Sequence, residues 1–490
     1  MNYRLALRLL GLLTLILAAS MLTCLPWAWL DDQPEILRAL GESILLSVGL
    51  GLVLLFVGHG TETQKLGQRE GLLVVTGSWI LAGLIGALPF LLSGVTHLPV
   101  DALFESISGF STTGASVLPA MEGIPRALLW WRSLIQWLGG MGIVVLFVAV
   151  LPSLGIGGRF LYRQEVPGPA KAGLRPHVRD TAMTLWKIYV GLSIAEVLAL
   201  SLAGMDIFDA LCHTFATMAT GGFSTRTASL GAFGIEAQLV VMFFMLLAGI
   251  NFTLYANLWR GGGMWSGKRG LRNMFRDPEL RLYLGLLLAA TLLLAGSLMS
   301  SGKHTPGDAL RLASFQAVSI QTTTGFATAD FDAWPSFCRL LLVMLMFVGG
   351  CAGSTGGSMK VVRFLVAGKL AIVQVRRFFR PRRVSRVRVG DEVISADMLG
   401  TISGFFILFL ATWGLVALAV ALTGSDLVTA ATASIACLGN IGPGLSAVGA
   451  TQNYSDMPAA AKLILAAAMI VGRLEVYTVL GLVSRSFWRP

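Results

Sequence analysis

Four short stretches set hydroxyl or amide side chains beside a glycine, between long apolar segments. They are Thr112-Thr113-Gly114, Thr220-Gly221-Gly222, Thr323-Thr324-Gly325 and Asn440-Ile441-Gly442. Glycine adopts positive φ at little steric cost, so successive backbone carbonyls can turn toward one line. Carbonyl oxygens arranged in that way replace the hydration shell of a monovalent cation. The stretches therefore predict an ion-selectivity filter, with glycine breaks used for helix packing as the alternative.

The spacing of the four stretches favours the filter. The central glycines Gly114, Gly222, Gly325 and Gly442 are 108, 103 and 117 residues apart. A period of about 110 residues indicates one structural unit used four times. Irregular backbone at membrane depth is costly unless it lines a cavity filled with water or ions. Four such breaks around one axis would form that cavity.

The composition is that of a membrane protein. The 490 residues are 55% hydrophobic and 13% charged, and the mean hydropathy is +0.74. This is too little charge to coat a water-soluble surface. The formal net charge of +11 could point to nucleic acid. We expect no such partner, because no basic stretch is interleaved with stacking aromatics, and basic residues mark the cytoplasmic loops of membrane proteins.

An N-terminal helix pair is predicted within residues 1–66. The uncharged runs 9–30 and 43–61 are each long enough to cross a bilayer. A cleaved secretory signal is the alternative for the first run. Its length and its end at Pro26-Trp27-Ala28-Trp29, a good interfacial anchor, favour a retained helix.

Four units follow, at 67–155, 156–262, 263–392 and 393–490. Each is expected to hold a long helix, a short re-entrant segment that ends in a glycine turn, and a second long helix. The expected long helices are 69–94, 126–151, 181–204, 235–259, 280–300, 336–375 (interrupted), 397–422 and 459–484. The expected short segments are 101–112, 209–220, 308–322 and 426–438. This predicts an all-α membrane protein of ten spans, with four parallel repeats around one pseudo-fourfold pore.

Charge gives the expected orientation. Of the 37 Lys and Arg residues, 29 fall in connections on one predicted side. The positive-inside rule then places both termini in the cytoplasm and opens the four turns from the outside. An even number of spans per unit makes the units parallel, which argues against an inverted-repeat carrier. The most basic connection contains Arg376, Arg377, Arg380, Arg382, Arg383, Arg386 and Arg388, and anionic lipid alone could explain it.

Each short segment begins near an aspartate: Asp101, Asp209, Asp308 and Asp426. Asp is a strong helix N-cap, so we expect these residues to cap the short helices. A half-membrane helix that enters from outside points its partially negative C-terminus at the bilayer centre, which favours a cation there. Direct ion contact by these carboxylates is the alternative, and Asp330, Asp332 and Asp456 could likewise attract cations or be ordinary loop acids.

Two features of the later helices are unusual for membrane spans. Residues 349–358 are too rich in glycine to continue a stable helix. A nucleotide-binding loop is disfavoured, because no GxxxxGK[ST] pattern occurs and the flanks are apolar. Arg473 is a charge inside the last apolar run, where charges are costly and usually functional. Direct pairing with Glu475 is not expected, since residues two apart on a helix face different directions.

The four turns resemble the filter loops of the Trk/Ktr/HKT superfamily of cation transporters. The N-terminal helix pair and Arg276-Asp277-Pro278-Glu279-Leu280-Arg281 resemble its TrkH/TrkG branch. The resemblance implies potassium uptake across the bacterial cytoplasmic (inner) membrane, with potassium bound at the turn residues as the transported substrate. In this family a serine at the first filter position accompanies sodium permeation, whereas glycine at all four, as here, accompanies potassium selectivity.

The resemblance also implies a gate and partners. It makes the run containing Gly349, Gly350, Gly353, Gly356 and Gly357 an intramembrane loop that obstructs the pore below the filter. It places Arg473 in that cavity, as a barrier or as a partner of the loop, with snorkelling toward the cytoplasm as the alternative. It adds a homodimer, and a docking role for the basic connection toward a cytosolic nucleotide-binding ring protein (TrkA-like). Gly139, Gly140 and Gly142 suit close helix contact or internal packing.

Other classes of function have less support. The five histidines are dispersed and the five cysteines form no CxxC pair, so neither an enzyme site, a cofactor nor a zinc site is predicted. Within transport, a sodium- or proton-coupled potassium symporter that uses the same filter is the alternative to a channel-like pore. A receptor or structural protein is disfavoured, because no long soluble segment is present to bind a partner.

Overall fold

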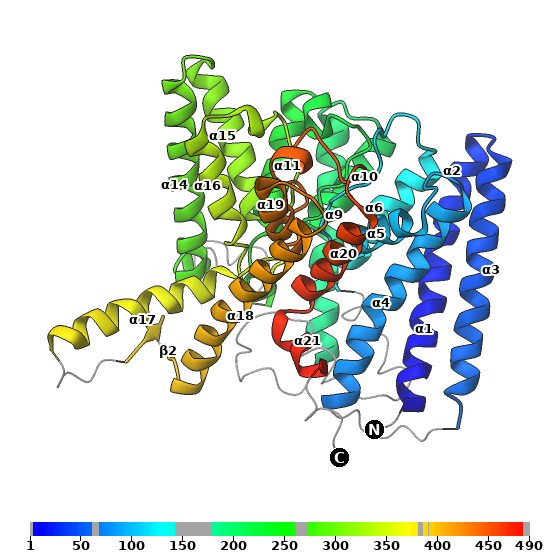
Figure 1. Cartoon of the computed structure of the whole chain (residues 1–490), viewed down its shortest axis with the longest axis horizontal. Helices are drawn as coiled ribbons and strands as arrows, with labels where there is room; N and C mark the ends of the chain where they lie inside the picture. The colour runs from blue at the N-terminus through cyan, green and yellow to red at the C-terminus, as the bar shows by residue number, and fades with distance from the viewer. Residues whose placement is uncertain are drawn as a thin grey trace.

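The computed structural model describes residues 3–60, 68–142, 178–260, 272–380, 386–390 and 392–483. Within these residues the chain is almost entirely α-helical. The one sheet described is a two-residue antiparallel pair, β1 (Arg388–Val389) and β2 (Glu392–Val393). The first helix begins and the last described helix ends at the same end of the molecule (Figure 1). All five cysteines are free and buried.

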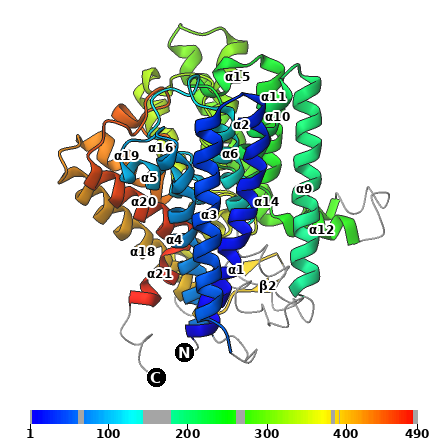
Figure 2. The same ribbon diagram turned by 90° about the vertical axis from the view of Figure 1, so that its right-hand side faces the viewer.

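The N-terminal helices form a close pair. Helix α1 (Tyr3–Met21) continues through a 3-10 turn into α2 (Leu25–Leu30), and α3 (Pro34–Val57) returns beside it (Figure 2). A Cβ atom at Gly11 would lie 2.9 Å from the carbonyl oxygen of Gly51, so glycine permits this approach. The opposite face of α1 is buried in the main core, and the helix is therefore an integral part of the fold.

Helices at the expected long positions alternate with helices at the expected short positions along the rest of the chain. At the long positions are α4 (Gln68–Leu92), α6 (Arg126–Gly140), α9 (Val178–Leu202), α11 (Ile235–Ala248), α14 (Pro278–Ser300), α16 (Ser336–Met346), α18 (Ala396–Ala421) and α20 (Ala459–Arg473). Of these, α16 has only 11 residues, fewer than the 16 of the preceding α15. The short helices between them are α5 (Pro99–Phe110), α10 (Ile207–Met218), α15 (Pro306–Gln321) and α19 (Leu427–Leu438). Three further helices, α12 (Phe252–Arg260), α17 (Val361–Phe379) and α21 (Val476–Val483), complete the described part.

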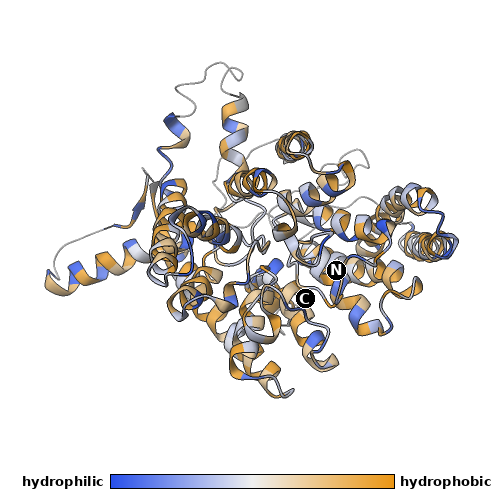
Figure 3. Cartoon of the chain, turned by 90° about the horizontal axis from the view of Figure 1, so that it is seen from above, coloured by the Kyte–Doolittle hydropathy of each residue, from blue (hydrophilic) through white to orange (hydrophobic). Residues whose placement is uncertain are grey.

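Six described helices are long and apolar enough to cross a membrane, or eight if each of two bent pairs is one span. Hydrophobic residues cover much of the outer helices when the molecule is seen from above (Figure 3). The expected helix 126–151 is observed as α6, and its last nine residues lie outside the described residues. So do the basic stretches 152–177 and 261–271, and Arg382 and Arg383.

Two helices expected to be continuous are sharply bent, so these expectations are wrong. The 235–259 segment bends by 87° between α11 and α12, and the 459–484 segment bends by 107° between α20 and α21. At the first bend the carbonyl of Gly249 accepts the N–H of Cys351 at 2.9 Å. At the second, Glu475 has a φ of +59°, which ends a right-handed helix.

The expected aspartate caps are correct at one helix of four. Asp426 caps α19 by accepting the N–H groups of Val428 and Thr429. Asp101, Asp209 and Asp308 instead lie within the first turns of α5, α10 and α15, which each begin two residues earlier. Proline at the first position starts α5 and α15 upstream, where its missing N–H is not needed. The first-turn carboxylates still complement the helix dipole.

Glycines on α6 allow close internal packing. A Cβ at Gly139 would collide with the carbonyl oxygen of Phe110, and one at Gly140 would lie 2.6 Å from the Cα of Ala219. These contacts join α6 to the ends of α5 and α10. Internal packing therefore accounts for both glycines.

Gly139→Ala is expected to destabilise the protein. The added methyl would meet backbone atoms, which cannot move aside as a side chain can. We therefore expect overpacking to lower the free energy of unfolding by about 1–3 kcal/mol. The midpoint of thermal unfolding of the detergent-purified protein should fall. Gly191→Ala is the matched control, because nothing lies within 4 Å of a Cβ at that position on α9. An equal change in both variants would contradict the packing account.

Candidate functional site

The four glycine turns share one backbone conformation. The second residue after each short helix has a left-handed φ, between +53° and +62°, at Thr112, Thr220, Thr323 and Asn440. The next N–H then donates to the carbonyl five residues back, as from Thr113 to Ser108 at 2.9 Å and from Ile441 to Ala436 at 2.8 Å. This is the Schellman ending of a helix. A glycine usually occupies the left-handed position of this ending, so a non-glycine residue there in all four turns marks a built feature.

The central glycines place the four turns side by side. A Cβ at Gly114 would collide with the carbonyl oxygen of Gly221, and one at Gly222 with that of Thr324. A Cβ at Gly325 would collide with the carbonyl oxygen of Ile441, and one at Gly442 would lie 2.7 Å from that of Thr113. Each glycine therefore faces the carbonyl that precedes the next glycine. The fourth contact returns to the first turn, so the turns form a closed ring.

A cavity of about 100 Å³ lies above this ring. All four central glycines line it, together with residues that follow each turn, such as Ser116, Ser224, Ala327 and Pro443. The Tyr454 hydroxyl, also in the lining, donates to the carbonyl of Gly442 at 2.8 Å. The ring is thus the floor of a polar depression.

Side chains brace the turns from behind. The Thr322 and Thr324 hydroxyls lie 2.8 Å apart, and those of Ser111 and Thr113 lie 2.7 Å apart. The Asn440 amide donates to the Thr113 hydroxyl at 3.0 Å, which ties the fourth turn to the first. The hydroxyls of the turns are therefore used in part as internal supports.

Gln136 supports the second turn and was missed in the sequence. Its amide nitrogen donates to the carbonyl of Gly221 at 2.7 Å, and its amide oxygen accepts the N–H of Phe223 at 3.1 Å. Arg132 and Gln136 are polar residues one helical turn apart in an otherwise apolar helix. That pattern was the available signal, because buried polar groups in a membrane helix face a partner.

The glycine-rich loop between α16 and α17 lies directly below the ring. It is non-helical from Phe347 to Lys360, as its composition predicted. The N–H of Gly357 donates to the Thr323 hydroxyl at 2.6 Å, and a Cβ at Gly357 would collide with the carbonyl of Gly439. A Cβ at Gly356 would lie 3.0 Å from the carbonyl of Thr322. The loop therefore contacts the inner ends of the third and fourth turns.

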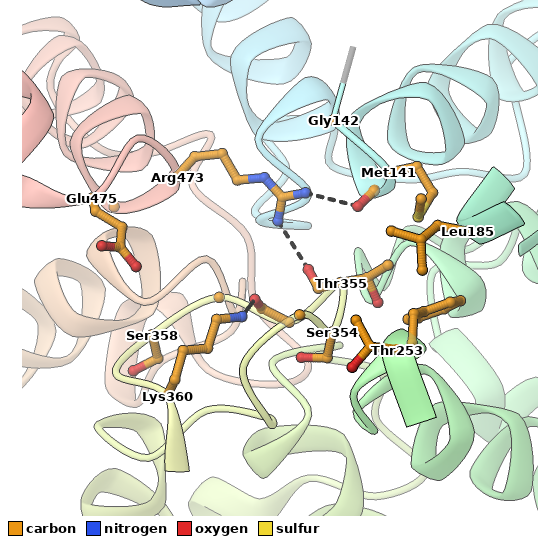
Figure 4. A pocket seen from close by; sticks show the side chains of 16 residues that line it. Met141, Gly142, Leu185, Thr253, Ser354, Thr355, Ser358, Lys360, Arg473 and Glu475 are labelled. Atoms are coloured by element: carbon orange, nitrogen blue, oxygen red, sulfur yellow. Dashed lines mark hydrogen bonds between the residues drawn. The ribbon is translucent and has the colours of Figure 1, made fainter. Parts of the chain in front are cut away.

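Arg473 lies at the end of α20, beside a bend, and not inside a continuous helix. One terminal nitrogen donates at 3.0 Å to both the Thr112 hydroxyl and the Thr355 carbonyl. The other donates to the carbonyls of Gly139 at 2.7 Å and Gly140 at 3.0 Å. One guanidinium thus joins the first turn, the glycine-rich loop and α6. Figure 4 shows its contacts with the loop and with the end of α6.

A second cavity, of about 90 Å³, lies around this guanidinium. Gly353, Gly356 and Gly357 line it with Arg473, whereas Gly349 and Gly350 are outside the lining, at the start of the loop. Lys360 also lines it and donates to the carbonyl of Gly356. The nearby Glu475 carboxylate is 2.7 Å from Arg363. The cavity below the ring therefore carries two cationic side chains.

The acidic residues expected at the pore mouth have partners in the loops that follow the turns. Asp332 accepts the N–H of Ser446 at 3.0 Å, and Asp330 accepts the N–H of Asp332 at 3.0 Å. Asp456 accepts from the Ser455 hydroxyl at 3.3 Å. In the loop after the first turn, hydrogen bonds from the Thr227 hydroxyl and N–H lower the pKa of Glu122. The contacts of Asp332 with Ser446 and of Glu122 with Thr227 join different loops, whereas those of Asp330 and Asp456 lie within one loop.

The comparisons with known proteins agree along the whole chain. The TrkH family model, described as "Cation transport protein", matches residues 42–488. Proteins named Trk system potassium uptake protein TrkH are 40% identical over 492 residues in Halomonas elongata and over 499 residues in Escherichia coli K12, covering 100% of both chains.

The crystal structure of the potassium transporter TrkH from Vibrio parahaemolyticus superposes with a TM-score of 0.89. It is 36% identical in sequence, with 100% of each chain covered. A family match over most of the chain and full-length relatives at this identity exceed what a shared fold alone would give. The chain therefore belongs to the TrkH family of cation transport proteins, and it is a transporter and not an enzyme.

Proposed function

We propose that this protein carries potassium into the cell through the ring of four glycine turns. One observation carries the proposal: the four glycines and the four carbonyls that precede them close a ring in cyclic order. Carbonyl oxygens held in a ring are suited to replace the water around a monovalent cation. The named activity of the relatives, potassium uptake, supports the choice of ion. The binding residues would be those of residues 112–114, 220–222, 323–325 and 440–442.

The ring implies four parallel repeats around a pseudo-fourfold axis. The second long helix of each proposed unit begins directly after Pro125, Gly234, Pro335 or Pro458. Counted from these starts, Gly139 and Gly472 are equivalent, and each packs against the carbonyl at the end of a short helix, that of Phe110 or Leu438. The proposed units remain 67–155, 156–262, 263–392 and 393–490, after the helix pair in 1–66. With that pair, the chain would cross the membrane ten times.

The location is the bacterial cytoplasmic membrane, with both termini in the cytoplasm. The bias of Lys and Arg toward one set of connections supports this orientation. The exposed end of α17, with Arg376, Arg377 and Arg380, points away from the rest of the molecule (Figure 1). It would meet anionic lipid and a cytosolic nucleotide-binding ring protein. Because four turns already complete one ring, each copy in a homodimer would have its own pore.

The glycine-rich loop would be the gate. The contacts of the loop with the third and fourth turns support this role, since a loop held there would obstruct the ring. Arg473 donates to the Thr355 carbonyl of the loop and adds a positive charge below the turns. Release of these hydrogen bonds would let the loop swing aside. The regulatory partner would act by favouring the released arrangement.

Ion flux into proteoliposomes tests the proposal. Purified protein should pass potassium at least about tenfold faster than sodium, the discrimination given by roughly 1.4 kcal/mol. Imposed proton and sodium gradients form the second arm. A channel-like pore should move potassium only down its own gradient, whereas a symporter would accumulate it against that gradient. Equal fluxes of potassium and sodium would reject the filter.

Glu279 is expected to hold the gate loop closed. One oxygen of its carboxylate accepts the N–H of Ala352, inside the loop, at 2.6 Å and that of Val362, at the start of α17, at 3.1 Å. Glu279→Ala should raise potassium flux in the absence of any partner by about tenfold, since hydrogen bonds to a charged group contribute about 1.5–3 kcal/mol. Glu236→Ala, at the exposed start of α11, is the control. Unchanged flux from well-folded Glu279→Ala protein would rule out this latch.

A further inference from the structure

A buried ion pair lies beside the first two turns, and its arginine also lines the cavity above the ring. Glu105 on α5 and Arg132 on α6 are joined at 2.6 Å, and their side chains are 0% and 4% exposed. Removing two charges from water costs several kcal/mol per ion, so a buried pair is weak support for stability. Stability therefore does not explain why this pair is buried here. The backbone segments that each partner holds in place do explain it.

Glu105 fixes the backbone that leaves the first turn. Its carboxylate accepts the N–H of Val117 at 2.9 Å and the hydroxyl of Ser116 at 3.1 Å. These residues follow Gly114 by two and three positions. The carboxylate therefore sets where the chain goes as it leaves the proposed filter.

Arg132 extends the same connection to the second turn. Its terminal nitrogen donates to the carbonyl of Ser224 at 2.9 Å, and its guanidinium carbon lies 3.5 Å from the centre of the Phe223 ring. These residues directly follow Gly222. A continuous set of contacts thus runs from Val117 through the ion pair to Ser224, across the boundary between the first and second turns.

The other three boundaries have different residues at these positions. Counted back from the central glycines, the equivalents of Glu105 are His213, Gln316 and Ala433. Counted from the starts of α11, α16 and α20, the equivalents of Arg132 are Val241, Leu342 and Leu465. His213 still reaches the Ser224 hydroxyl at 2.9 Å, as Glu105 reaches Ser116. Hence no equivalent position carries a carboxylate and guanidinium pair.

We propose that Glu105 and Arg132 are positioning residues that set ion selectivity by fixing the first turn against the second. The inference rests on the proposed function, in which the ring selects potassium. A ring that discriminates by the placement of its carbonyls requires each boundary to hold its spacing. Loss of the charged connection would let the first boundary relax, so that the smaller sodium ion is also coordinated. The protein would then lose its preference for potassium over sodium while it still transports ions.

Comparison of potassium and sodium flux in proteoliposomes tests this. Glu105→Gln keeps the shape of the side chain but turns an amide donor toward groups that are themselves donors. The flux ratio of potassium to sodium should fall by about tenfold, in line with the loss of charge-assisted hydrogen bonds. Arg132→Lys keeps the charge without the planar fork, and should give an intermediate ratio.

The matched control is Asp101→Asn on the same short helix. It breaks a pair of similar length, 2.7 Å to Lys462, whose ammonium otherwise reaches the carbonyl of Ser455 and no residue of the turns. Its flux ratio should equal that of the unmodified protein. A selectivity change in this variant as large as in Glu105→Gln would overturn the assignment.

The flux measurements distinguish failure of the proposed function from failure of the inference about the ion pair. If the unmodified protein does not prefer potassium, the proposed function fails. If it does, and Glu105→Gln lowers total flux at an unchanged ratio, the pair is structural only and the inference is overturned. Should Glu105→Gln not give monodisperse protein, Arg132→Lys decides, because it leaves a charged pair in place. An unchanged ratio in that variant overturns the inference equally.

Discussion

Gly325→Ser is expected to abolish the preference for potassium over sodium. Gly325 has a φ of +83°, and a Cβ there would collide with the carbonyl oxygen of Ile441. A left-handed conformation costs a residue with a side chain roughly 1–2 kcal/mol, and the collision adds to that cost. The third turn or the Ile441 carbonyl must move, so the ring opens at one boundary. The flux ratio should fall by at least about tenfold.

The measurement compares potassium and sodium flux into proteoliposomes made with equal amounts of folded protein. Gly307→Ser is the matched control. It lies in the first turn of the short helix α15 in the same unit, and nothing is within 4 Å of a Cβ there. The control should keep the selectivity of the unmodified protein. If Gly325→Ser keeps it as well, the four glycines serve helix packing and the filter is wrong.

The turns were found in the sequence because their signal is local. A glycine beside hydroxyl residues, between apolar runs, ends a helix whatever surrounds it. Its repetition at four regularly spaced positions strengthened the prediction. The short helices were likewise placed within about three residues, the usual uncertainty of such boundaries. Composition alone also located the non-helical loop that contains Gly356.

The bends in the later helices depend on distant contacts. Apolar runs flank both bends, so hydropathy predicts unbroken helices at 235–259 and 459–484 although Asn251 lies at the first bend and Arg473 and Glu475 lie at the second. The structure bends the first where Gly249 receives the N–H of Cys351, about 100 residues later in the chain. It bends the second where Gly472 meets the carbonyl of Leu438. Neither partner can be identified from the local sequence.

The aspartates show a similar limit. The recurrence of Asp-Ala-Leu marked equivalent positions, but an N-cap and a first-turn residue have nearly the same composition around them. Their actual partners are on other elements: Asp101 with Lys462, and Asp209 with Thr225 and Arg226. Glu105 and Arg132, also distant in sequence, were missed for the same reason. Only the packing of α5 against α6 brings them together.

Arg473→Ala is expected to raise potassium flux in the absence of any regulatory partner. The guanidinium lies in the cavity below the ring, where two unit charges 4 Å apart repel by about 4 kcal/mol at an effective dielectric constant of 20. The substitution also removes the hydrogen bond to the Thr355 carbonyl of the loop. Removing only about 1.4 kcal/mol of this repulsion would raise the potassium flux about tenfold. Single-channel recording or potassium efflux from proteoliposomes would measure it.

Arg473→Lys and Arg473→Gln separate the two contributions of this residue. Lysine keeps the positive charge but cannot span Thr112, Thr355 and the carbonyls of α6 together, whereas glutamine keeps some hydrogen bonding without charge. A barrier made by charge predicts flux near that of the unmodified protein for lysine and high flux for glutamine. A loop held by hydrogen bonds predicts high flux for lysine and less for glutamine. Low flux in all three variants would show that Arg473 neither repels the ion nor holds the gate, because each variant removes at least one of these functions.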